Sequence, residues 1–312
     1  MRVVFFGSSE FAVLPLKSLI EAGAYICCVV TQPDKKQGRG LHLEGTPVKN
    51  IAKSAGLKIH QPQNINTKES AGFLKSLLPD LFIVIAYGQI LSQEILDIPG
   101  IFSINAHASL LPKYRGAAPI NWAIVKGEKT TGVSIIKVNS KMDAGEIILQ
   151  KKIEIRENDT TVTLSQKLSE LSALSVLESL SALENNKVKL TKQKPSEITL
   201  APLLKKESGL IDWSAKARDL YNLVRGMLPW PGAFTYFHGK LLKVYSSRVC
   251  GFASSQVHPG EIVKISKSGI VVATGEGCLE ISELQIEGKR RMSAEEFASG
   301  HKIKAGQILG KI

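Results

Sequence analysis

Cysteine is scarce in this 312-residue sequence, and the few cysteines lie at spacings that do not suit cross-linking. Of the four, Cys27 and Cys28 are adjacent within an apolar run, whereas Cys250 and Cys278 stand alone. Without a C-x-x-C pair the sequence offers neither a disulfide framework nor a cysteine-rich zinc site. We therefore predict reduced, buried thiols of the kind found in cytoplasmic proteins, and no bound metal.

Long apolar runs and glycine-rich turns are missing as well. The first apolar run, residues 3–6, is too short for a signal peptide, and no stretch approaches the roughly 20 apolar residues of a membrane span. The turn Gly7-Ser8-Ser9 holds one glycine where dinucleotide-binding proteins have G-x-G-x-x-G. We expect a cytoplasmic protein that avoids membranes and binds no dinucleotide.

Positive charge, by contrast, is abundant and unevenly distributed. The formal net charge is +12, and 312 residues suffice for two domains. Residues 1–188 hold 21 Lys and Arg against 17 Asp and Glu, whereas residues 189–312 hold 19 against 11. The shorter part thus carries +8 and the longer part +4, which favours a polyanionic partner for the C-terminal part.

The first 188 residues show a βαβ pattern. Short apolar strands at residues 3–6, 25–31, 81–86 and 101–104 alternate with helices, of which the first, 10–22, is expected to be capped by Ser8 or Ser9. A leucine stripe from Leu164 to Leu183 predicts a long helix over 160–183 that packs on the sheet. This pattern predicts an α/β, Rossmann-like domain with a mostly parallel sheet.

The remainder of the chain changes character after residue 188. Residues 189–206 are polar and basic with two prolines, which is typical of a linker. Residues 207–312 begin with a helix and continue as five short strands separated by turns, which predicts a small OB-like antiparallel β-barrel.

One stretch, residues 101–119, carries the chemistry. Asn105 and His107 lie two apart at the end of a strand, so both side chains point to one side, and two donors aimed at one oxygen suit an oxyanion in acyl transfer. Asp143, in the turn between strands 132–138 and 147–155, is a candidate partner for the imidazole. Each residue alone could be structural: the histidine a buried core residue, Asn105 and Asp143 turn formers.

The whole stretch Asn-Ala-His-Ala-Ser-Leu-Leu-Pro-Lys-Tyr-Arg-Gly-Ala-Ala-Pro, with the later Asp-Ala-Gly, resembles the signature of folate-dependent formyltransferases, most closely the methionyl-tRNA formyltransferase family. The resemblance implies an enzyme that moves the formyl group of 10-formyltetrahydrofolate to the amino group of initiator methionyl-tRNA. It makes Asn105, His107 and Asp143 catalytic, without a metal. It also implies a folate site lined by two segments: Gln89, Ile90 and Leu91, and Ser109, Leu110, Leu111 and Pro112.

Two basic segments are candidates for tRNA contact. The polar segment 32–47 reads as a long loop with Lys35, Lys36 and Arg39, and the resemblance places Arg39 at the tRNA acceptor arm. Lys289, Arg290 and Arg291 form the densest basic run of the predicted barrel. The plain alternatives are a solvated insertion for the first segment and a solvated face for the second.

Two other functions remain open at this point. One is formylation of a small amine, such as glycinamide ribonucleotide or an amino sugar nucleotide, against which the basic barrel and the Gly-Arg-Gly of the loop both count. The other is an RNA-binding module on an inactive scaffold, against which the joint presence of Asn105, His107 and Asp143 counts. We expect a monomer.

Overall fold

A computed structural model describes residues 1–37, 42–251 and 257–310. The chain forms two compact units. Unit 1 comprises residues 1–119, 130–154 and 165–201, and unit 2 comprises residues 120–129, 155–164 and 202–312. In the described part of the chain no helix combines the length and apolar character needed to cross a bilayer.

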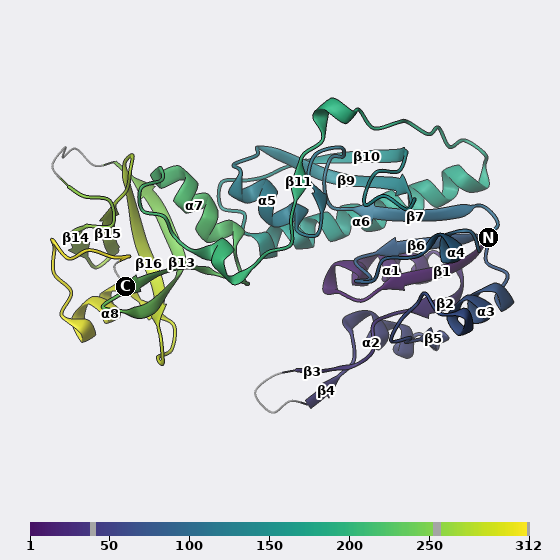
Figure 1. The fold of residues 1–312 in the computed structure, drawn as a ribbon, viewed down its shortest axis with the longest axis horizontal. Helices are drawn as coiled ribbons and strands as arrows, with labels where there is room; N and C mark the ends of the chain where they lie inside the picture. The colour runs from purple at the N-terminus through teal and green to yellow at the C-terminus, as the bar shows by residue number, and fades with distance from the viewer. Residues whose placement is uncertain (38–41, 252–256, 311–312) are drawn as a thin grey trace. The chain divides into compact units, whose positions relative to one another are not determined.

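A seven-stranded sheet with the order β10-β9-β7-β6-β1-β2-β5 forms the centre of unit 1 (Figure 1). The five strands from β5 to β7 are parallel, whereas β9 runs antiparallel to both β7 and β10. The sheet is therefore mostly parallel and Rossmann-like, as predicted. Its strands are β1 (Arg2–Gly7), β2 (Tyr25–Val30), β5 (Ile59–His60), β6 (Leu81–Ile85), β7 (Phe102–His107), β9 (Thr130–Lys137) and β10 (Ile147–Glu154).

Helices cover both faces of this sheet, which explains why its central strands are apolar throughout. On one face, Val4, Phe6 and Phe82 pack against residues of α3 (Lys68–Ser76) and α4 (Gln93–Leu96). On the other face, Val3 lies beside the end of α1 (Val13–Glu21) and Leu180 of α6 (Thr161–Glu184). The helix α2 (Pro47–Ser54) packs against α1.

The leucine stripe of α6 only partly faces the core. Leu164, Leu168 and Leu180 are buried, but Leu174 is 60% exposed. Small residues replace leucine on the buried side of the middle turns, including Ser172 and Ser175. Leucines spaced every three residues do not stay on one face of a helix with 3.6 residues per turn. The prediction that the whole leucine stripe packs on the sheet was therefore wrong.

The start of the chain differs from prediction in two details. Ser9 precedes the 3₁₀ turn Glu10–Ala12 without capping it, and the Ser8 hydroxyl donates to the carbonyl of Tyr87 at 2.8 Å. Segment 32–47, expected to lack structure, contains a hairpin of β3 (Lys35–Gln37) and β4 (His42–Glu44). Lys35 lies opposite Glu44, a cross-strand pair of unlike charges that favours this register.

The stretch after α6, read from sequence as a linker, is attached to unit 1 up to Ala201. Thr191 exchanges two backbone hydrogen bonds with Ile147, of 2.8 and 2.9 Å. Further on, β11 (Leu200–Ala201) pairs in parallel with β8 (Arg115–Gly116), next to the 3₁₀ turn Pro195–Glu197. We call residues 191–201 the strap, because both ends are anchored to the sheet and its loops.

Unit 2 is built on a six-stranded antiparallel sheet with the order β12-β13-β16-β15-β14, in which β17 pairs with β16. This confirms the predicted second domain of β type. Its elements are the 3₁₀ turn Lys206–Gly209, α7 (Ala217–Gly226), β12 (Ala233–Phe237), β13 (Lys240–Cys250), β14 (Ile262–Ser266), β15 (Gly269–Ala273), β16 (Cys278–Ile286), β17 (Met292–Ser293) and α8 (Ala294–His301).

Unit 2 also includes α5 (Pro119–Val125), apart from its first residue, and residues 155–164, both well before residue 207 in sequence. The buried Arg225 on α7 donates to the carbonyl of Asp159 at 2.8 Å and to the side chain of Asn222. The carbonyl of Gly226, at the end of α7, accepts from Asn121 and Thr161 at 2.8 and 2.6 Å. These bonds join early segments of the chain to α7.

Candidate active site

Strand β7 carries the first two candidates, and it is longer than predicted. Asn105 and His107 lie within the strand, not after it, because pairing with β9 continues to His107 opposite Ser134. Asn105 lies opposite Val84 on the neighbouring parallel strand β6, so the two side chains share one face of the sheet. This is the face against which α3 and α4 pack. The spacing of two puts the His107 side chain on the same face.

His107 is buried and held from both ring nitrogens. Its Nε2 donates to the backbone carbonyl of Tyr114 at 2.9 Å. Its Nδ1 lies 3.5 Å from Oδ1 of Asp143. Because a carbonyl can only accept, Nε2 must carry a proton, and Nδ1 is the nitrogen that faces the remaining candidates.

Asp143 completes the cluster from the turn between β9 and β10. Its Oδ1 accepts from Nδ2 of Asn105 at 3.4 Å, and its Oδ2 accepts from the backbone amide of Gly116 at 2.8 Å. The residue has φ 51°, a left-handed conformation that aspartate adopts more readily than most residues but that still carries strain. The structure thus brings Asn105, His107 and Asp143 into direct contact.

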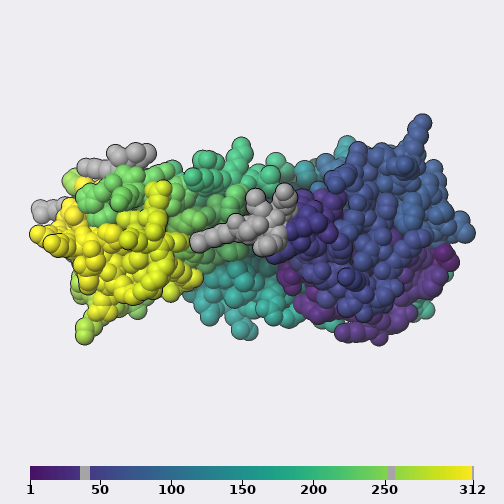
Figure 2. All heavy atoms as spheres, turned by 90° about the horizontal axis from the view of Figure 1, so that it is seen from below, coloured from purple at the N-terminus to yellow at the C-terminus, as the bar shows by residue number. Residues whose placement is uncertain are grey.

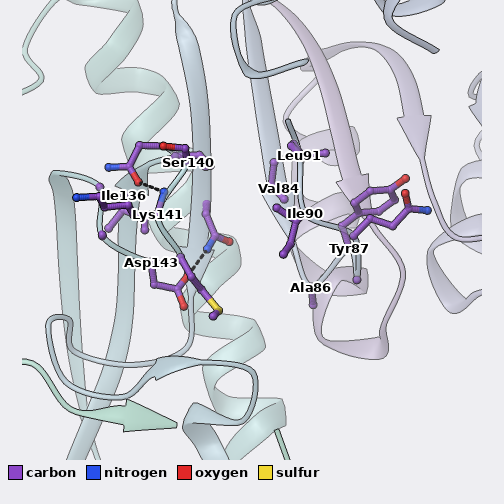
Figure 3. Close-up of a pocket in the computed structure, with 17 residues that line it drawn as sticks. Val84, Ala86, Tyr87, Ile90, Leu91, Ile136, Ser140, Lys141 and Asp143 are labelled. Carbon is purple, nitrogen blue, oxygen red and sulfur yellow. Dashed lines mark hydrogen bonds between the residues drawn. The ribbon is translucent and has the colours of Figure 1, made fainter. Parts of the chain in front are cut away.

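A cavity of about 280 Å³ opens beside this cluster, and Asn105 and Asp143 belong to its wall. Figure 3 shows its two sides: Ile136, Ser140, Lys141 and Asp143 on one, and Val84, Ala86, Ile90 and Leu91 on the other. Ile90 and Met142 are 81% and 69% exposed, unusual values for large apolar side chains in a cavity wall. Such exposed apolar groups beside a cavity favour a partly apolar ligand.

The expected folate residues divide into two groups. Gln89, Ile90 and Leu91 line the cavity. The Gln89 side chain itself accepts from the amide of Ile65 at 2.9 Å, so the backbone is what this residue offers to a ligand. The ring of Tyr87 points away from the cavity (Figure 3). Burial raises the pKa of its hydroxyl, so the hydroxyl stays neutral.

The other expected folate segment lies elsewhere. Ser109, Leu111 and Pro112 are buried, and neither they nor Leu110 line this cavity. The Ser109 hydroxyl donates to the carbonyl of Lys113, and the amide of Leu111 donates to the hydroxyl of Ser134. Ser109, Leu110, Leu111 and Pro112 therefore do not belong to the wall of this cavity.

The candidate tRNA residues are only partly described. Arg39 lies outside the described residues; Lys35 is exposed on β3, and Lys36 is its neighbour there. In the turn before β17, Arg290 is paired with Glu296 at 2.9 Å, and Arg291 is paired with Glu283 and lies over the Tyr245 ring. Lys289 is exposed in the same turn, on the late part of the chain drawn in yellow in Figure 2.

Sequence reasoning missed two residues of the strap. Thr199 accepts from the amide of Tyr114 at 2.9 Å, and Tyr114 in turn holds His107. Gln193 donates to the carbonyls of Asp143 and Gly145, both at 2.8 Å. Nothing in a polar, proline-containing stretch pointed to these contacts, because they depend on tertiary placement alone.

The described part of the chain contains no group of three or more His, Cys, Asp or Glu side chains that could hold a metal ion. The cluster itself consists of an amide donor, an imidazole and a carboxylate beside a ligand-sized cavity. That combination suits stabilisation of a developing oxyanion together with proton transfer.

Comparison with known proteins agrees with this chemistry. Residues 1–180 match the formyl transferase family model, and residues 203–302 match the model of the formyl transferase C-terminal domain. The chain is 46% identical over 310 residues to a methionyl-tRNA formyltransferase of Caldanaerobacter subterraneus subsp. tengcongensis, covering 99% of this chain and 100% of that protein. It is 44% identical to the one of Acetivibrio thermocellus over the full length of both.

A solved structure shares the fold at much lower identity. The sugar 3N-formyl transferase WlaRD, crystallised with dTDP and 5-N-formyl-THF, superposes with a TM-score of 0.67 at 18% identity, covering 93% of this chain and 99% of that one. With the family models and the full-length relatives taken together, the chain belongs to the formyltransferase family and, within it, to the methionyl-tRNA formyltransferases.

Proposed function

We propose that the protein transfers the formyl group of 10-formyltetrahydrofolate to the amino group of the methionine on initiator methionyl-tRNA. One observation supports this more than any other: Asp143 contacts both Asn105 and His107, and Asn105 and Asp143 line a cavity sized for part of a flat ligand. The folate supplies an activated formyl group. The chain's own residues supply orientation, oxyanion stabilisation and a path for one proton.

Asn105 and His107 are the oxyanion donors in this proposal. Asn105 has two N–H donors and uses one of them on Asp143, which leaves the other for the cavity that the residue lines. His107 donates to a substrate oxygen in its imidazolium form, in which Nδ1 carries a proton while Nε2–H stays on the Tyr114 carbonyl. The 3.5 Å contact between Nδ1 and Asp143 is longer than a strong hydrogen bond, so this proton can turn to the substrate. Each donor is expected to contribute about 10²–10³ in kcat.

Asp143 is the proton carrier. As the amine nitrogen forms its bond to the formyl carbon, it must lose a proton, and the folate nitrogen must gain one as its own bond to that carbon breaks. The Asp143 carboxylate lies at the cavity wall with its Oδ2 held by Gly116, so it can accept and return this proton directly or through water. The reaction thus balances without a metal or a nucleophilic side chain.

The cavity fits the ring portion of the folate better than the whole molecule. Its volume of about 280 Å³ is at the lower end of ligand pockets, which measure roughly 300–1,000 Å³. Ile90, Leu91 and Val84 offer apolar contact, and the backbone from Gly88 to Leu91 offers hydrogen bonds. We assign Gln89, Ile90 and Leu91 to this site.

We assign the tRNA to two basic segments, one from each end of the chain. The catalytic domain, 1–188, contributes Lys35, Lys36 and Arg39, and the C-terminal barrel, 207–312, contributes Lys289, Arg290 and Arg291, with 189–206 between them. Arg290 and Arg291 are already paired with Glu296 and Glu283. A phosphate in this segment therefore binds Lys289, or it replaces one of these carboxylates as the partner of an arginine. The working form is a monomer in the cytoplasm.

The test is formyl transfer with purified components. Initiator methionyl-tRNA is offered beside an elongator methionyl-tRNA, glycinamide ribonucleotide and an amino sugar nucleotide, each with 10-formyltetrahydrofolate. The expected result is rapid product only with the initiator tRNA. Preferential formylation of a small amine would contradict the proposed substrate, and turnover of none of the four would contradict the proposed activity.

A further inference from the structure

The turn that carries Asp143 is held in an unfavourable shape. Asp143 has φ 51°, a left-handed conformation that is unfavourable for a residue with a side chain. Two residues on, Gly145 lies so close to β9 that an added Cβ would stand 1.6 Å from the carbonyl oxygen of Lys137. A turn of this shape persists only where its surroundings hold it.

The side chain of Gln193, on the strap, binds this turn at two carbonyls. Its amide nitrogen donates to the carbonyls of Asp143 and Gly145, each at 2.8 Å, so one group bridges both sides of the turn. Its amide oxygen accepts from Nε and Nη2 of Arg115 at 3.1 and 2.7 Å. The guanidinium can only donate, so it fixes which end of the amide faces the turn.

All four hydrogen-bonding positions of the Gln193 amide are therefore used. The strap holds Gln193 from both sides, through the paired backbone bonds of Thr191 with Ile147 and through the pairing of β11 with β8. Arg115 is adjacent to Gly116, whose amide donates to the Asp143 carboxylate. Residues 115 and 116 thus hold Asp143 in two ways. The amide of Gly116 binds its carboxylate, and Arg115 binds Gln193, which in turn binds its backbone carbonyl.

We propose that Gln193 is a positioning residue of the formyl-transfer reaction: it holds the Asp143 turn in the conformation from which the carboxylate reaches Asn105 and His107. This inference rests on the proposed function, since it concerns the same site. Gln193 itself does not line the cavity and is not a catalytic residue. Replacing Gln193 is expected to slow turnover without weakening the binding of tRNA or of folate.

The test combines single and double variants of the full-length protein. Gln193→Ala is expected to lower kcat about 10- to 100-fold, as a displacement of about 1 Å does, while KM for tRNA and folate stays within about twofold. Gln193→Glu keeps the size and the Arg115 contact but replaces both donors with acceptors, so it is expected to be at least as slow. Ser196→Ala, an exposed position on the strap, is the matched control and is expected to behave as wild type.

The double variant separates positioning from general stabilisation. If Gln193 acts through Asp143, adding Gln193→Ala to Asp143→Ala is expected to cost no further turnover. Wild-type kcat in Gln193→Glu, or a double variant slower by the full product of both single losses, would overturn the inference. Wild-type turnover in Asp143→Ala would instead overturn the proposed site itself, so the two failures are distinguishable.

Discussion

Replacing Gly116 by alanine is expected to displace the backbone amide that binds Asp143, which affects both stability and turnover. Gly116 has φ 123°, where a residue with a side chain is strained, and an added Cβ would stand 2.6 Å from the carbonyl oxygen of Ala201. The backbone must move, which shifts the amide that donates to Asp143 at 2.8 Å. Strain of about 1–3 kcal/mol and a weakened bond to a charged group, worth about 1.5–3 kcal/mol, act together.

We therefore expect Gly116→Ala to lower the free energy of unfolding by about 2.5–6 kcal/mol and kcat by about 10- to 100-fold. Urea unfolding measures the first quantity, and steady-state formyl transfer well below the melting temperature measures the second. Gly72→Ala is the control: Gly72 is an exposed residue of α3 where a Cβ meets nothing, so kcat is expected to stay and stability to rise by about 0.4–1 kcal/mol. Wild-type stability and turnover in Gly116→Ala would refute this reasoning.

Three further outcomes are expected. Arg225→Met removes a buried guanidinium that donates to the carbonyl of Asp159 and to the side chain of Asn222, so urea unfolding should show a loss of about 2–4 kcal/mol; an unchanged midpoint would contradict this. The ion pair with Arg248 holds the pKa of Glu280 below its usual 4.5, so its stabilisation is present above pH 4.5 and lost as the pH falls further. Urea unfolding should thus find Glu280→Gln weaker than wild type at neutral pH, with the gap closing below pH 4.5; a gap independent of pH would argue against this. Alanine at positions 289–291 should raise the KM for tRNA but not for folate, and the rise relative to wild type should be smaller at high salt. Equal changes in both KM values would indicate that these residues have only a structural role.

The sequence predicted the layout of the fold because its signals are local and strong. Continuous apolar strands such as 81–86 are typical of a parallel sheet buried on both faces, and the turn-separated strands after residue 207 are typical of an antiparallel domain. The structure confirms both. The hairpin in segment 32–47 was missed, since its register depends on cross-strand pairs such as Lys35 with Glu44 that a polar composition hides.

The site could be predicted only as far as its motif extends. Asn105, His107 and Asp143 lie together as their spacing and turn suggested. The support from Gln193 and Thr199 could not be foreseen, because it comes from 50 and 85 residues away in sequence. Polar residues in a stretch without periodicity give no sign of which carbonyl or amide they will meet.

The single-turnover rate of His107→Ala shows whether the cluster on β7 and its aspartate turn perform formyl transfer. With enzyme in excess over methionyl-tRNA and saturating 10-formyltetrahydrofolate, we predict a rate about 10²- to 10³-fold below that of wild type, with the dissociation constants of tRNA and folate unchanged. A rate close to wild type in a folded variant would show that His107 is a structural residue, and the proposed mechanism would be wrong.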